Sequence, residues 1–97
     1  QMPMFPGGER ALMQYLASNI TYPQKARKNN IQGTVVLNFV VEKNGKISKV
    51  EVVRGVIGGC SEEAVRVIEQ MPPWEPGKAD DVPIKARFTL PIRFRLE

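Results

Sequence analysis

The feature that most constrains the fold is a pair of valine-rich stretches separated by Asn44-Gly45. β-Branched residues favour extended strands. Asn-Gly is typical of a two-residue hairpin turn, because a type I′ turn requires positive φ at both central positions. The sequence therefore predicts an antiparallel hairpin over residues 34–54, with Asn44 and Gly45 alone at its tip.

The two-residue turn also sets the register of this hairpin. It places Leu37 opposite Val52 and Val41 opposite Ser48, whereas a slip of one residue would place Leu37 opposite Glu51. Because one face of the sheet must be buried, the first register is favoured. The other face is mixed and includes Ile47. The face expected to be buried carries Val35, Leu37, Phe39, Val41, Val50 and Val52.

The C-terminal stretch alternates apolar and polar residues over residues 82–96. Such alternation predicts one long strand with a buried face and a solvated face. In a strand, the N–H groups of alternate residues point to the same lateral edge. Pro83 and Pro91 are both odd-numbered, so both missing N–H groups fall on one edge. The opposite edge is free to pair with the hairpin, and the interrupted edge is expected to lie at the rim of the sheet.

The remaining segments complete the expected architecture. Residues 1–30 form an N-terminal helical segment with an apolar stripe at four-residue spacing, and residues 61–71 form a helix with Ser61 as its N-cap. This second helix carries the chain back along the sheet, so the last strand pairs with the first, in the order 2-1-3. The 97 residues are expected to form one α+β domain, with a three-stranded antiparallel sheet and helices packed on one face in a second layer.

Composition argues against catalysis and metal binding. The chain has no His and a single Cys, Cys60, so the commonest general base and metal ligand is missing and no intrachain disulfide can form. Without a base to activate it, Cys60 is expected to be a small buried side chain. The acidic pairs Glu62-Glu63 and Asp80-Asp81 have no nucleophile at a recognisable spacing. We expect no enzyme activity, no cofactor and no metal.

Trp74 stands between prolines and has two interpretations. A lone tryptophan can stack on a ligand, but more often it is a large apolar side chain that closes one end of a core. We expect the structural role.

The polar face of the last strand is basic. It carries Lys85, Arg87, Arg93 and Arg95 in a chain of net charge +4. Sheets that bind nucleic acid stack bases on exposed aromatic rings, but Phe88 and Phe94 have the opposite parity and belong to the core. We therefore expect no nucleic-acid partner. Prolines and basic side chains on a rim strand are common protection against edge-to-edge aggregation, so these residues alone assign no partner to the edge.

The order of several short motifs resembles the C-terminal domain of TonB energy transducers. The motifs are Tyr22-Pro23 with Ala26, Ile31-Gln32-Gly33-Thr34-Val35, Asn44-Gly45-Lys46-Ile47, Glu63-Ala64, Trp74-Glu75-Pro76-Gly77 and Leu90-Pro91-Ile92-Arg93-Phe94. The lead-in Phe5-Pro6-Gly7-Gly8-Glu9 and the run Met71-Pro72-Pro73-Trp74 resemble the members found in Bacteroidetes. The resemblance covers nearly the whole chain and implies the fold of TonB and TolA C-terminal domains.

This resemblance also implies a function. It implies a periplasmic domain of an inner-membrane-anchored protein that binds the TonB box of outer-membrane receptors and transmits energy from the proton-motive force for active uptake. Strand addition at the rim of residues 82–96 is the mode of binding that we expect. The partner-binding residues expected there are Lys85, Arg87, Phe88, Thr89, Arg93 and Arg95.

Other partners are implied more loosely. Contact with an inner-membrane proton-channel complex would involve parts of the parent protein outside this sequence, and a homodimer is compatible with the family. The alternative is a TonB-like interaction domain fused to a membrane sensor or peptidase protein.

Overall fold

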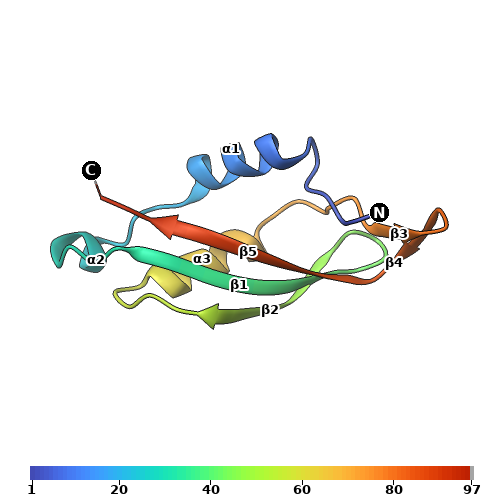
Figure 1. Cartoon of the computed structure of the whole chain (residues 1–97). Coiled ribbons are helices and arrows are strands. Elements are labelled where there is room, and N and C mark those ends of the chain that lie inside the picture. Colours follow the sequence, from blue (N-terminus) through green and yellow to red (C-terminus); the bar gives the residue numbers. More distant parts are fainter. Residues whose placement is uncertain (97) are drawn as a thin grey trace.

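The predicted hairpin and the C-terminal strand form a three-stranded antiparallel sheet (Figure 1). Its strands are β1 (Gly33–Val41), β2 (Ile47–Arg54) and β5 (Ala86–Phe94). The strand order β2-β1-β5 confirms the predicted order 2-1-3. The computed structural model describes residues 1–96 of the chain.

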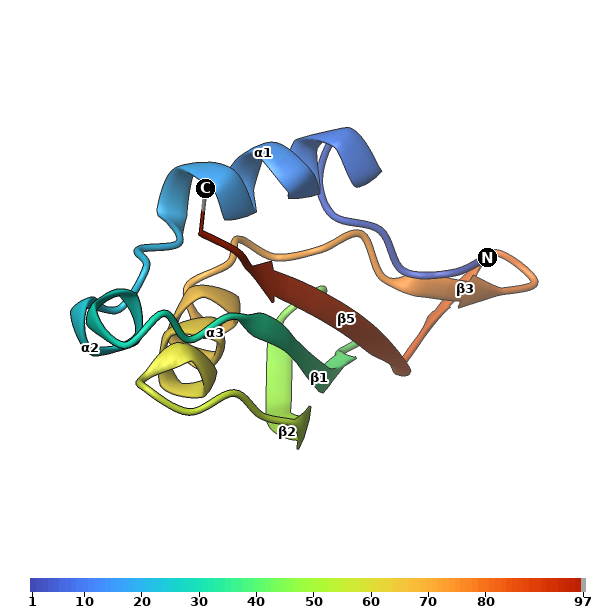
Figure 2. The ribbon, with the colours of Figure 1, turned by 60° about the vertical axis from the view of Figure 1, so that its left-hand side comes forward.

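The described helices lie on one face of the sheet, beyond one of its edges and at one of its ends (Figures 1 and 2). Helix α3 (Cys60–Glu69) covers one face, while α1 (Glu9–Asn19) lies beyond β5, on the side away from β1. Helix α2 (Gln24–Lys28) is a single short turn at one end of the sheet. The molecule is elongated, with principal extents of 49 × 22 × 17 Å.

The core lies between the sheet and the helices, mainly on the face that the alternation predicts, although Val52 of that face is 37% exposed. Val35, Leu37, Phe39 and Val41 of β1 are fully buried, and β5 contributes Leu90, Ile92 and Phe94. Trp74 is 3% exposed, and its ring meets those of Phe5, Phe39 and Phe88 at centroid distances of 5.9, 5.2 and 4.9 Å. The burial of Trp74 agrees with the structural role expected for it.

The predicted two-residue turn at Asn44-Gly45 is wrong. The loop has one more residue, because Gly45 N donates to Glu42 O (2.8 Å) and Glu42 N donates to Lys46 O (2.9 Å). Of the two tip residues, Gly45 alone has positive φ, at 89°. This is a tight turn followed by a left-handed glycine, another common way to close a hairpin. Trp74 N also donates to Gly45 O (2.8 Å), so a tertiary contact favours this loop.

The longer loop shifts the register next to the turn. Val41 faces Ile47, so Ile47 packs against the core and is not on the mixed face. An irregularity then follows in β2, where Lys49 has φ of 51°. This bulge inserts one residue and restores the predicted pairing of Leu37 with Val52.

The single strand predicted over residues 82–96 is also wrong. Its first part is β4 (Val82–Ile84), which pairs with β3 (Gly77–Ala79) in a separate two-stranded sheet. Asp80 and Asp81 link them with φ of 51° and 64°, values that Asp adopts more readily than most residues. The long strand β5 begins only after Lys85, and it ends at Phe94.

The helix predicted over residues 61–71 begins one residue earlier and ends at Glu69. Its N-cap is Gly59, in a left-handed conformation with φ of 95°, and not Ser61. Ser61 Oγ instead accepts a hydrogen bond from Val56 N (2.8 Å) and donates to Val56 O (3.0 Å). The hydroxyl therefore closes the glycine-rich loop before the helix.

Candidate functional site

The outer edge of β5 is a regular and unpaired edge of the sheet. β1 pairs with β5 without a shift, from Gly33 opposite Phe94 to Val41 opposite Ala86. N–H groups of alternate residues point to the same edge, and Pro91 has none. The even-numbered residues therefore serve β1, and the odd-numbered ones point outward. No described residue pairs with this outer edge.

The other free edge of the sheet, on β2, is less suited to pairing. Its register shifts twice along its length, and Lys49 within it has φ of 51°. Bulges of this kind twist an edge and protect it from pairing. The β5 edge is thus the better template for an added strand.

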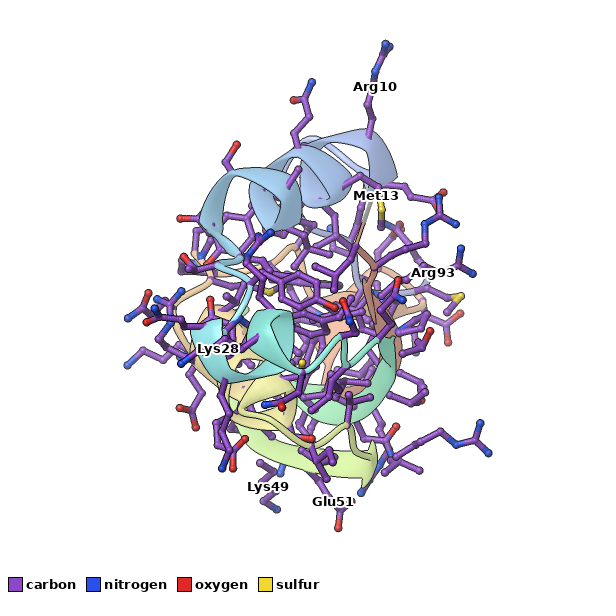
Figure 3. The ribbon with its side chains drawn as sticks, turned by 90° about the vertical axis from the view of Figure 1, so that its left-hand side faces the viewer. Arg10, Met13, Lys28, Lys49, Glu51 and Arg93 are labelled. Atoms are coloured by element: carbon purple, nitrogen blue, oxygen red, sulfur yellow. The ribbon has the colours of Figure 1, made fainter. Side chains whose placement is uncertain are left out.

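The structure brings three of the six predicted site residues together. Arg87, Thr89 and Arg93 are exposed and lie on the same face of β5. Thr89 Oγ1 donates to Asn38 Oδ1 (2.6 Å), which holds that side chain toward β1. Neither arginine forms an ion pair with any residue that the structure describes. Arg93 extends outward, on the same side of the molecule as Met13 of α1 (Figure 3).

The other three predicted residues lie apart from this strip. Lys85 precedes β5, with its Nζ 3.9 Å from Glu42 Oε1. Phe88 is half-buried and packs against the core. Arg95 follows the end of β5.

A groove of about 440 Å³ runs between the outer edge of β5 and the N-terminal segment. Its lining is mostly apolar. From β5 and the core it is lined by Trp74, Phe88, Thr89, Leu90 and Pro91, and from the N-terminal segment by Met2, Pro3, Met4, Phe5, Glu9, Leu12 and Met13. Sequence reasoning did not find this groove, because it placed the N-terminal segment on the sheet face and not along β5.

The N-terminal wall of the groove is held by backbone pairing. Met4 N donates to Glu75 O (2.9 Å), and Glu75 N donates to Met4 O (2.8 Å). Lys78 N donates to Gln1 O (2.9 Å) in the same antiparallel arrangement. The N-terminus accordingly lies beside β3 (Figure 2).

The best organised polar cluster in the described chain connects helices. Glu63 Oε2 accepts hydrogen bonds from Arg66 Nη2 (2.7 Å) and from Thr21 N (2.8 Å), and Arg66 also donates to Asn19 O (3.0 Å). The hydrogen bond from Arg66 lowers the pKa of Glu63. The cluster joins α3 to the segment after α1, so its role is structural.

Reactive groups are few among the described residues. Cys60 is fully buried, and this burial, followed by the negative charge of Glu62, raises the pKa of its thiol. Residues 1–96 contain no cluster of His, Cys, Asp and Glu suited to a metal ion. None of the described helices is both long and apolar enough to span a membrane.

The structure is a small α+β domain with an unpaired strand edge. Residues 18–96 match the family described as the Gram-negative bacterial TonB protein C-terminal. The chain therefore belongs to the family of C-terminal domains of TonB energy transducers.

Individual relatives agree with this family. The Protein TonB of Vibrio cholerae serotype O1 is 31% identical over 80 residues, which cover 78% of this chain and 31% of that protein. The chain thus spans about a third of the length of this relative.

Solved structures share the fold. An NMR structure of the Helicobacter pylori TonB C-terminal domain has a TM-score of 0.67 at 19% identity, with 89% of this chain and 78% of that one covered. A second NMR structure of that domain has a TM-score of 0.65 at 19% identity, with 88% and 89% covered. The family match begins at residue 18, so the N-terminal wall of the groove lies outside it.

Proposed function

We propose that this chain is the periplasmic, receptor-binding domain of a TonB-type energy transducer. In this proposal it binds the TonB box of outer-membrane receptors by strand addition to the outer edge of β5. The observation that carries the proposal is a regular, unpaired strand edge in a member of the TonB family.

Strand addition suits a protein that has to pull on its partner. A row of main-chain hydrogen bonds resists withdrawal of the peptide and depends little on the peptide's side chains, so one edge can serve several receptors. The nine residues of β5 offer outward N–H groups at Arg87, Thr89 and Arg93.

The side chains along this edge have secondary roles. Arg87 and Arg93 are exposed, so each adds orientation and salt-dependent attraction of at most about 1 kcal/mol. Lys85 and Arg95 flank the two ends of β5, and Phe88 supports the edge from the core.

The remaining parts of the proposal concern the parent protein. The parent is anchored in the inner membrane, draws on the proton-motive force through a proton-channel complex outside this chain, and performs no enzymatic reaction. The named relative is a TonB protein, which supports a transducer over a fusion to a sensor or peptidase.

A proline at position 87 tests the proposed edge. Arg87→Pro removes one outward N–H and leaves the β1-facing N–H groups in place. We expect it to weaken the binding of a TonB-box peptide about tenfold, the value of one hydrogen bond at the upper end of its range. Arg87→Ala should cost less than about fivefold. Isothermal titration calorimetry measures both affinities.

Thermal unfolding is the control, because proline can disturb the strand itself. The proposal requires that Arg87→Pro remains folded at the assay temperature. A folded Arg87→Pro variant that binds the peptide as tightly as the parent contradicts strand addition at this edge.

A further inference from the structure

The groove beside β5 is lined by apolar side chains that backbone pairing with an added strand would not need. Three exposed methionines surround it: Met2 is 71% exposed, Met4 41% and Met13 48%. Exposed apolar side chains gathered at one concave place indicate a binding surface more than scattered ones do. The only ionisable group among the lining residues is the Glu9 carboxylate.

The pleat of an added strand fixes where its side chains go. Peptide residues that lie opposite Phe88 and Leu90 share their face and point toward the inner side of the groove. The next residues in the peptide point to the open face, beside Arg87 and Arg93. The volume of about 440 Å³ lies within the range of about 300–1,000 Å³ typical of ligand sites, so apolar side chains of moderate size can enter.

Charge distinguishes the two faces of such a peptide. Arg87 and Arg93 form no ion pair with the described residues, so acidic peptide side chains on the open face gain attraction. Glu9 lines the groove and repels an acidic side chain that turns inward. Opposite charges across neighbouring strands stabilise pairing, and like charges destabilise it.

We propose that the peptide added to β5 alternates apolar and acidic residues, and that the N-terminal segment, residues 1–13, forms the wall that selects its apolar side chains. This inference rests on the proposed strand addition and goes further, because it names the peptide's chemistry. The segment precedes residues 18–96, which match the family, so the preference depends on a part of the chain outside that match.

The N-terminal wall is held in place by the rest of the fold, so it can select the apolar side chains of the peptide. Its backbone pairs with Glu75 and Lys78. Phe5 is 7% exposed, and its ring lies 5.4 Å from that of Tyr15 and 5.9 Å from that of Trp74. The exposed methionines thus sit on a fixed backbone, and methionine adapts to differently shaped apolar partners.

Two synthetic peptides of equal composition test the pattern. One repeats Glu-Val four times, and the other has four Glu followed by four Val, both with blocked ends and a fluorescent label. We expect the alternating peptide to bind at least tenfold tighter in fluorescence anisotropy. Equal affinities overturn the inference.

Three variants test whether the groove causes the preference for the alternating peptide. Met13→Glu places a charge in the groove and is expected to weaken the alternating peptide at least fivefold. Met13→Leu keeps an apolar side chain, and Val53→Glu adds the same charge at a 58% exposed site on β2. Both controls should change affinity less than twofold. If Met13→Glu and Val53→Glu weaken binding equally, net charge and not the groove decides, and the inference is overturned.

NMR separates this inference from the proposed function. Binding should shift the methyl signals of Met2, Met4 and Met13 much more than that of the buried Met71, together with the β5 amides. If the β5 amides shift while the methionine methyls do not, strand addition stands and the groove inference is overturned. If the β5 amides do not shift, strand addition is wrong. If dilution of the chain alone shifts the methyls, a second copy fills the groove, which also overturns the inference.

Discussion

Replacing Trp74 with alanine is expected to lower the free energy of unfolding by about 3–5 kcal/mol, as large core truncations do. The indole is 3% exposed and packs edge-on against Phe39 and Phe88, at 5.2 and 4.9 Å between ring centroids. Its removal leaves a cavity where β1, β5 and the N-terminal segment meet. Urea-induced unfolding followed by circular dichroism measures the loss.

A milder change nearby provides the control. Trp74 Nε1 donates to Met71 Sδ (3.4 Å). Met71→Leu keeps the volume but removes that acceptor, so it should cost about 1–3 kcal/mol. Trp74→Ala should lose peptide binding only to the extent that it unfolds. A variant that keeps its melting temperature but no longer binds peptide would place Trp74 in the binding site.

The second large effect is expected at Gly45. An alanine there has to adopt a φ of 89°, and its Cβ would lie 2.1 Å from the main-chain oxygen of Trp74. Backbone strain and overpacking each cost about 1–3 kcal/mol, so Gly45→Ala should destabilise the domain by about 2–6 kcal/mol. Chemical denaturation is again the measurement.

Gly8→Ala tests backbone strain at a site without a close contact. Gly8 has a φ of 88°, but the nearest atom to its added Cβ, beyond its chain neighbours, is Met4 Sδ at 3.9 Å. This substitution strains the backbone without a clash. A Gly45→Ala variant that is as stable as the parent would contradict both the backbone strain and the close contact with Trp74.

Much of the sheet could be predicted, because strand formation and pairing depend here on patterns within short stretches of sequence. Alternation identified the buried face of β5, and the parity of Pro91 showed which of its edges pairs. The apolar pattern also fixed Leu37 opposite Val52, although two errors cancelled there: the loop has one residue more than expected, and the bulge at Lys49 compensates. A pattern of period two cannot reveal such paired irregularities.

The remainder depends on contacts between distant segments. The Asn44-Gly45 loop is shaped by its hydrogen bond to Trp74, which local turn preference does not include. The long C-terminal strand is broken at Lys85, because residues 82–84 pair with β3 across the turn at Asp80 and Asp81, while β5 pairs with β1.

The groove depends on such contacts as well. One of its walls is the lead-in, which pairs with the chain near Glu75. Of the candidate site, the strip of Arg87, Thr89 and Arg93 was therefore predictable, and the methionine-lined wall was not.

Hydrogen exchange of the β5 amides tests strand addition most directly. In the free domain, the amides of Phe88, Leu90 and Ile92 face β1 and should exchange slowly, whereas those of Arg87 and Thr89 face outward and should exchange quickly. A saturating TonB-box peptide should slow Arg87 and Thr89 and change the even-numbered amides little. Unchanged exchange at both residues when the peptide is bound, or new protection along β2 instead, would contradict strand addition at β5.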